Sequence, residues 1–184
     1  MDTMLAASTA PIDDAALDRA AERAARALGV TAGEVVRFES SSTVSLAGAW
    51  AGPGTPPPSA EMRAIRLPLH RGGVHDQVRG SGRPARVADY ARLADSTSQT
   101  LAELGTRSAA AAPIVVDGAL WGSLGVSSEQ PGMLRSGACA RLERLAEEIG
   151  RSLSRAPARK TRARAAAGTL AAMLAGSHSG RVLA

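Results

Sequence analysis

The stretch APIVVDGALWGSLGVSS, residues 112–128, decides the fold of this chain. Two apolar runs flank the pair Asp117-Gly118, and Asp-Gly favours a type I′ turn, whose twist matches that of paired antiparallel strands. The sequence therefore predicts an antiparallel β-hairpin over this stretch. We expect the hairpin to lie at the centre or at the far edge of a single antiparallel sheet.

An amphipathic helix is predicted near each end of the chain. The first follows Asp13 or Asp14, either of which can cap a helix, and it ends at Gly29. Its apolar stripe consists of Leu17, Ala21, Ala24 and Leu28. The second covers residues 137–153, with a stripe of Leu142, Leu145, Ile149 and Leu153. We expect both helices on one face of the sheet.

The region between the first helix and the hairpin alternates between strand and helix patterns. Strands are predicted for EVVRFES, TVSLAGAW, IRLPL and RVADY (34–40, 43–50, 65–69 and 86–90). Helical turns are predicted over 74–79 and 97–105, and a Pro- and Gly-rich surface loop over 51–60. Pro68 indicates an edge or the end of a strand. This order predicts an α+β fold, a single domain with a central antiparallel sheet flanked by helices.

At 184 residues, the chain is long enough for one domain with tails. We expect a flexible arm over residues 1–12, the domain over 13–153 and a basic, Ala-rich tail over 154–184. Residues 151–184 hold seven of the 22 basic residues and none of the 17 acidic ones. The net charge of +5 therefore belongs to the tail, because residues 1–150 retain 15 basic and 17 acidic residues, a net charge of −2.

Cys139 is the only cysteine, which excludes an intrachain disulfide and a thiolate zinc site within one chain. A metal site would require His70 and His75 to converge with Asp76, and their spacing does not enforce this, so we expect no metal. The N-terminus lacks an export signal, and no stretch is apolar over the length of a membrane span. We expect a cytoplasmic protein.

Three phrases carry a resemblance to a known family: GRPARVADYA (82–91), SAAAAPIVVDGALWGSLGVSS (108–128) and RLERLAEEIGRSL (141–153). In this order they resemble the GAF domain of bacterial signalling proteins, over residues 13–153. The resemblance implies a non-catalytic cytoplasmic module for signal transduction, which binds a small molecule in a cleft beside the sheet, mediates dimerisation, or does both. In that family the last helix leads into an effector domain. Here the helix is expected to break at Pro157, so we expect either a stand-alone sensor or a remnant of a larger protein.

If a ligand binds, we expect its site between the sheet and the segment 74–104. Its apolar walls would be Trp50, Val74, Val78, Tyr90 and Leu101. Such walls favour a neutral, largely apolar or aromatic ligand over a cyclic nucleotide. Arg79 and Arg86 are the candidate residues that would instead favour a phosphate. Asp89 beside Tyr90 could orient a ligand.

The resemblance also raises cofactors that the residues do not favour. A haem would need His70 or His75 as its axial ligand, and a bilin or a redox role would fall on Cys139. We interpret Cys139 as a packing residue and expect no cofactor.

Three further expectations concern activity and partners. An enzyme on the same scaffold is an alternative, but the sequence has no GxSxG, P-loop or HExxH motif, and we expect none. A second alternative is a nucleic-acid-associated regulator acting through the basic tail, because six positive residues lie between 151 and 164, at the start of the tail and just before it. We also expect a homodimer through the terminal helices, helped by the small residues Ala21, Ala24 and Ala25, and a possible signalling partner protein.

Overall fold

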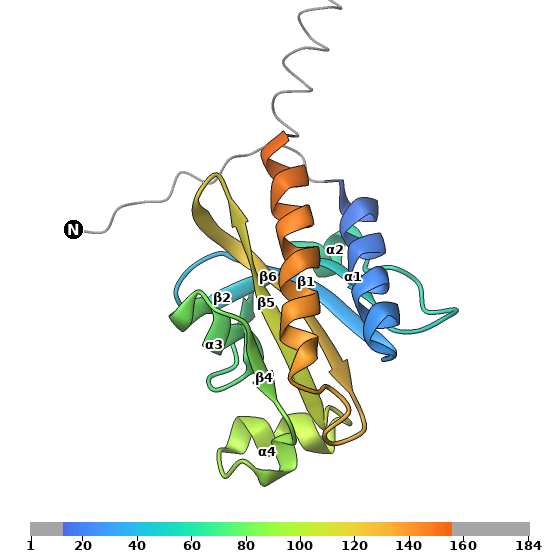
Figure 1. The fold of residues 1–184 in the computed structure, drawn as a ribbon, viewed down its shortest axis with the longest axis vertical. Coiled ribbons are helices and arrows are strands. Elements are labelled where there is room, and N and C mark those ends of the chain that lie inside the picture. The colour runs from blue at the N-terminus through green and yellow to red at the C-terminus, as the bar shows by residue number, and fades with distance from the viewer. Residues whose placement is uncertain (1–12, 156–184) are drawn as a thin grey trace, which may run out of the picture. The chain divides into compact units, whose positions relative to one another are not determined.

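The computed structural model describes residues 13–155, which form a six-stranded antiparallel sheet with helices on both faces (Figure 1). The strands are β1 (Ala32–Phe38), β2 (Thr43–Trp50), β3 (Leu67–Pro68), β4 (Ala85–Val87), β5 (Ser108–Val116) and β6 (Ala119–Ser128). Their order across the sheet is β3-β2-β1-β6-β5-β4. The helices are α1 (Asp14–Leu28), α2 (Ala60–Ala64), α3 (Val74–Ser81), the 3₁₀ turn η1 (Tyr90–Arg92), α4 (Ser96–Glu103) and an unlabelled helix over 137–155. The α+β fold predicted from the sequence is confirmed.

The predicted hairpin is formed by β5 and β6, and β6 lies at the centre of the sheet beside β1. Both turn residues have positive φ, 50° at Asp117 and 81° at Gly118, as a type I′ turn requires. Pro68 lies in the edge strand β3, where its missing N–H breaks no ladder.

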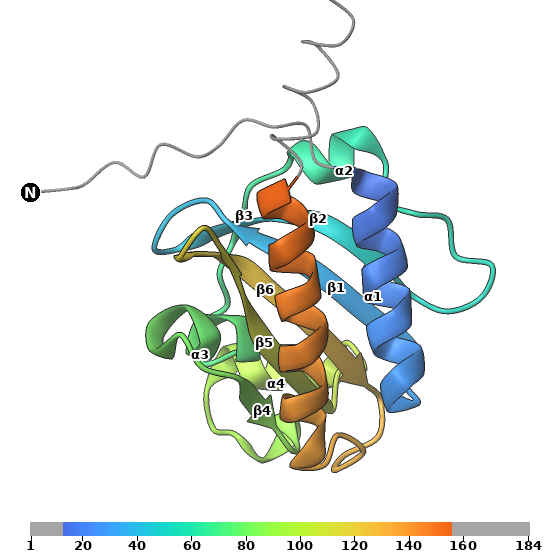
Figure 2. The same cartoon turned by 45° about the horizontal axis from the view of Figure 1, so that its top comes forward.

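The helices α1 and 137–155 lie side by side on one face of the sheet, in Figure 1 and in Figure 2. The guanidinium of Arg23 in α1 contacts the Glu148 carboxylate at 2.5 Å, and Arg141 donates a hydrogen bond to the Ala27 carbonyl at 2.6 Å. The prediction that both helices cover one sheet face is confirmed.

Small residues let α1 approach the sheet closely. Ala21, Ala24 and Ala25 are fully buried, and a Cβ added to Gly33 in β1 would collide with the Ala21 carbonyl oxygen. A Cβ at Gly48 in β2 would likewise collide with the backbone of Leu17. The alanine stripe that we expected to support a dimer therefore packs inside the domain, so it offers no surface to a partner.

Several element bounds differ from the predictions. Only Leu67 and Pro68 of IRLPL form a strand, because the chain just before them forms the unforeseen helix α2, which Ser59 caps through its hydroxyl. The predicted strand 86–90 ends at Val87, because the Asp89 carboxylate accepts a hydrogen bond from Ala91 N–H and starts the turn η1.

None of the described helices is long and apolar enough to cross a membrane. The proposed arm and most of the proposed tail lie outside the described residues.

Candidate functional site

A cleft of about 410 Å³ lies on the sheet face opposite α1. Strands β1 and β2 form its floor, and β3, the chain before α3, η1 and α4 contribute to its walls. The volume is within the range of roughly 300–1,000 Å³ that is usual for small-molecule sites. Most of its lining is apolar, including Val36, Leu46, Leu67, Val74, Leu101 and Val126. The cleft can therefore remove the apolar part of a ligand from water.

The polar centre of the cleft is His75, in the first turn of α3. Its Nε2 lies 2.9 Å from Glu34 Oε1 on β1, and its Nδ1 lies 2.6 Å from Ser123 Oγ on β6. Ser123 is fully buried, whereas 43% of the Glu34 side chain is exposed. Three elements far apart in the sequence thus place one hydrogen-bonded chain along the side of the cleft.

Gly125 makes room for the imidazole. A Cβ at this position of β6 would lie 2.6 Å from Cε1 and 2.8 Å from Nε2 of His75. Any larger residue would push the ring away from Glu34 and Ser123. The close approach of α3 to the sheet therefore depends on this glycine.

Glu34 is ionised at neutral pH. Burial by itself would raise the pKa of its carboxyl, but the electrostatic influence of His75, the hydrogen bond from His75 and the more distant His70 hold that pKa below its usual value. The Ser123 hydroxyl has His75 Nδ1 as its hydrogen-bond partner among the described residues. If Ser123 donates to Nδ1, then Nε2 carries the proton and donates to Glu34. This arrangement gives each of the three side chains a hydrogen-bond partner.

The chain of Ser123, His75 and Glu34 does not have the geometry of a hydrolytic triad. In a triad the serine contacts Nε2 and the acid contacts Nδ1, so the two ring nitrogens here have the opposite partners. Ser123 is also fully buried beneath the imidazole, where no substrate carbonyl can reach it. The arrangement holds a histidine in place and does not activate a nucleophile.

Four of the seven residues proposed from the sequence line the cleft: Trp50, Val74, Tyr90 and Leu101. The Tyr90 hydroxyl accepts a hydrogen bond from the backbone N–H of Val74 at 3.3 Å, which ties η1 to the start of α3. The Arg26 guanidinium of α1 lies over the ring of Trp50, 5.2 Å from its centroid, and Trp50 is among the residues that line the cleft.

The other three proposed residues lie elsewhere. Val78 is fully buried in a cluster with Ala85, Val87 and Ala111, behind the cleft wall. The Arg79 guanidinium lies over the Phe38 ring at 5.3 Å, and Arg86 donates to the Leu134 carbonyl at 3.0 Å. Neither arginine lines the cleft, so the two cations that could have favoured a phosphate are absent from its lining.

Asp89 holds η1 in place. Its carboxylate accepts two hydrogen bonds from the Arg107 guanidinium, each 3.0 Å long, and these bonds lower the pKa of Asp89 despite partial burial. Asp89 does not line the cleft; its neighbour Tyr90 does. The pair was proposed to orient a ligand, and Asp89 instead fixes the wall that presents Tyr90.

Sequence reasoning missed Glu34, although one signal for it was present, and it considered His75 only as a candidate metal or haem ligand. Alternate residues of a β-strand point to the same face of the sheet, so Glu34 and Val36 of β1 share a face. A carboxylate on an otherwise apolar strand face is unusual and indicates a site. No comparable signal links His75 to Ser123, because the two are 48 residues apart and meet only through the packing of α3 on β6.

The residues considered for cofactors lie apart from one another. Cys139 is on the helix 137–155, with its Sγ 3.8 Å from the Ala85 carbonyl oxygen, and burial raises the pKa of its thiol. His70 and His75 line the cleft, but within residues 13–155 no three His, Cys, Asp or Glu side chains are grouped to hold a metal ion. His178 and most of the basic tail lie outside the described residues.

A sequence profile of the GAF domain family matches residues 14–153. No curated protein matches the chain. Among solved structures, a domain of a two-component sensor histidine kinase protein from Sinorhizobium meliloti is 16% identical with a TM-score of 0.60, over 84% of this chain and 99% of that chain.

Two other similar structures are named as GAF domains. One, from an Acinetobacter phosphoenolpyruvate-protein phosphotransferase, is 16% identical with a TM-score of 0.60, over 80% of this chain and 85% of that one. The other, a phycoerythrobilin-bound domain from a cyanobacterial phytochrome, is 13% identical with a TM-score of 0.63, over 80% and 88%. At these identities the likeness establishes the fold alone.

Proposed function

The chain belongs to the GAF domain family over residues 14–153, and from this premise we propose that it is a non-catalytic sensory module that binds a small molecule in the cleft beside β1. GAF domains are sensory and regulatory modules of signalling proteins. The observation that carries the proposal is the cleft itself, a largely apolar hollow of about 410 Å³ with one hydrogen-bonded polar chain at its side. Apolar walls with a few placed polar groups are the usual composition of a ligand site.

A regulatory module also needs a way to report occupancy. The cleft is walled partly by short elements, namely β3, η1 and α4, which are held to the sheet by individual contacts such as Asp89 with Arg107. Because a ligand would touch these elements and the central strands at once, binding would order them relative to the sheet. The helix 137–155 packs on the opposite face of the sheet, where Gly150 meets the backbone of Val115 in β5, so a change that passes through the sheet can reach it.

The test of ligand binding is a thermal-shift screen of the full chain against neutral, cationic and anionic small molecules. Ala49 lines the cleft and its side chain is partly exposed, so Ala49→Phe should fill the cleft and abolish every shift. Ala15→Phe is the matched control, because Ala15 is exposed on α1 on the other side of the sheet. A shift that survives Ala49→Phe, or one that Ala15→Phe also removes, would contradict binding in this cleft.

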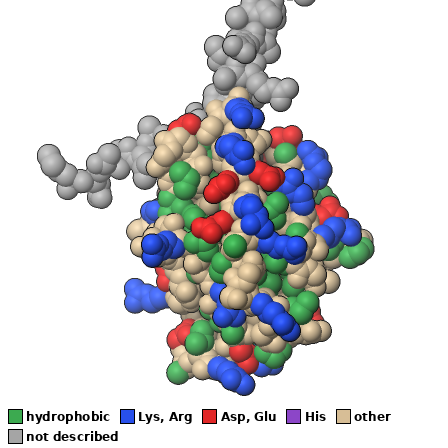
Figure 3. Space-filling view, viewed as in Figure 1, with side chains coloured by type: hydrophobic (Ala, Val, Ile, Leu, Met, Phe, Trp, Pro, Cys, Tyr) green, Lys and Arg blue, Asp and Glu red, His purple; other side chains and the backbone are tan. Residues whose placement is uncertain are grey.

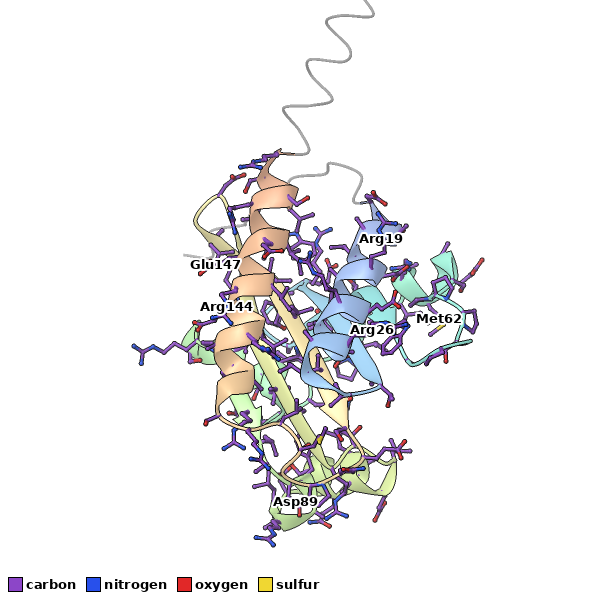
Figure 4. The ribbon with its side chains drawn as sticks, turned by 45° about the vertical axis from the view of Figure 1, so that its right-hand side comes forward. Arg19, Arg26, Met62, Asp89, Arg144 and Glu147 are labelled. Carbon is purple, nitrogen blue, oxygen red and sulfur yellow. The ribbon has the colours of Figure 1, made fainter. Side chains whose placement is uncertain are left out.

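Dimerisation remains part of the proposal, on a different surface from the one first expected. The outer face of α1 and of the helix 137–155 carries interspersed basic and acidic side chains (Figure 3), including Arg19, Arg144 and Glu147, which project from the two helices in Figure 4. Alternating charges of this kind can pair between two copies of a chain. A homodimer through this face would therefore weaken as salt is added.

A further inference from the structure

The cleft has an acidic electrostatic character. The ionisable side chains that line it are Glu34, His70, His75 and Tyr90, and no Lys or Arg is found among the described residues of its lining. Glu34 is the one carboxylate of the set. The Glu34 carboxylate therefore faces no Lys or Arg side chain within this lining.

Glu34 lines the cleft and has an unused hydrogen-bond acceptor. His75 engages Oε1, and Oε2 has no hydrogen-bond partner among the described residues. The carboxylate cannot turn away, because Oε1 is fixed by an imidazole that is itself fixed by Ser123 at its other nitrogen. Since 43% of the side chain is exposed while Glu34 lines the cleft, the free oxygen is accessible to a ligand there.

The two properties together define a chemical class of ligand. A carboxylate at the side of an apolar cleft attracts a positively charged donor and repels an anion, and the surrounding low polarity strengthens both effects. The apolar walls meanwhile require that most of the ligand be hydrocarbon or aromatic. Carboxylates and phosphates would face Glu34 with no Lys or Arg in the lining to compensate its charge.

We propose that the cleft takes a small organic cation, a protonated amine on an apolar or aromatic body, whose ammonium group donates a hydrogen bond to Glu34 Oε2. The body lies against Val36, Leu46 and Leu101. This assignment rests on the proposed function, because it specifies the ligand of the same cleft. It replaces the expectation of a neutral ligand, which was based on the apolar walls without Glu34.

The experiment uses three indole compounds of nearly equal size and different charge: tryptamine, tryptophol and indole-3-acetate. Calorimetry with the full chain at pH 7.5 should show tryptamine binding about tenfold more tightly than tryptophol or better, as a hydrogen bond to a charged group contributes. Indole-3-acetate should bind most weakly. Raising the salt concentration should weaken tryptamine binding more than tryptophol binding.

Glu34→Gln should bring the affinities for tryptamine and tryptophol within about twofold of each other, because the amide is isosteric and uncharged. Glu147→Gln, on the exposed face of the helix 137–155, should leave the preference unchanged. If Glu34→Gln does not fold, Glu34→Asp serves instead, since it keeps the charge at a longer distance and should reduce the preference without abolishing it.

The outcomes separate the two proposals. Binding of tryptophol or indole-3-acetate as tightly as tryptamine, blocked by Ala49→Phe, would overturn the cation assignment and leave ligand binding in the cleft intact. A tryptamine preference that persists in Glu34→Gln would also overturn it. If no compound of these three or of the wider screen binds, the proposed function fails and the cation assignment fails with it.

Discussion

Replacing Gly125 by Ala tests the central packing contact of the site. The new Cβ would lie 2.6 Å from Cε1 of His75, about 1 Å closer than ordinary van der Waals contact allows. The imidazole could swing aside only by giving up its hydrogen bonds to Ser123 and Glu34. We therefore expect the substitution to disconnect the polar chain of the cleft as well as to destabilise the domain.

The expected magnitude follows from what each group loses. Ser123 is fully buried and would be left without its partner, which costs about 1–3 kcal/mol. The Glu34 contact adds only about 0.5 kcal/mol, because its carboxylate is partly exposed and screened by solvent. We expect a loss of about 2–3 kcal/mol in the free energy of unfolding, or a fall in Tm of roughly 4–12 °C for a chain of this size.

Urea denaturation of single and double variants provides the assay. In a His75→Ala background the clash and both hydrogen bonds are already absent, so Gly125→Ala should cost less than about 0.5 kcal/mol there. Gly80→Ala is the control, because Gly80 lies within α3 with open space around it and alanine should stabilise the helix by about 0.5–1 kcal/mol. Equal costs of Gly125→Ala in both backgrounds would refute the reasoning.

Three further outcomes are expected. Arg63 is 12% exposed and donates two hydrogen bonds to Asp18, of 2.7 and 2.9 Å. Arg63→Ala should therefore lower the free energy of unfolding, measured by urea titration, by about 1–3 kcal/mol. Arg66 is half-exposed, so Arg66→Ala should change this free energy by less than about 0.5 kcal/mol. The pKa of Glu34 is lower in the folded than in the unfolded chain, so the ionised carboxylate stabilises the fold above about pH 4.5, and this contribution is lost as the pH falls through the folded pKa. The difference in free energy of unfolding between wild type and Glu34→Gln should therefore narrow between pH 6 and pH 3. A difference that stays constant over this range would count against an ionised Glu34. Light scattering should give a dimer mass at low salt that falls toward the monomer mass as salt is raised, and a monomer mass at every salt concentration would exclude the charged helix face as an interface.

The sequence by itself determined the elements whose signals are local. The Asp117-Gly118 turn predicts the hairpin because both residues must adopt positive φ, and Asp13 and Gly29 set the ends of α1 by capping its backbone groups. The periodicity of the apolar residues then assigned both long helices to one sheet face. Part of the cleft wall also followed, because Val74, Tyr90 and Leu101 lie on the segment that must cross the open face of the sheet.

The tertiary structure alone decided the polar part of the site. Glu34, His75 and Ser123 are brought together by the packing of α3 on β5 and β6, from which His75 reaches Glu34 on β1, and no local pattern encodes a contact between residues 41 or 48 positions apart. Tertiary contacts also place Arg79 over the Phe38 ring and Arg86 against the Leu134 carbonyl, outside the lining of the cleft. The position of a residue along a strand or helix determines which face of that element its side chain leaves. The partner that a long side chain then reaches depends on which elements pack beside it, and only the tertiary structure decides that.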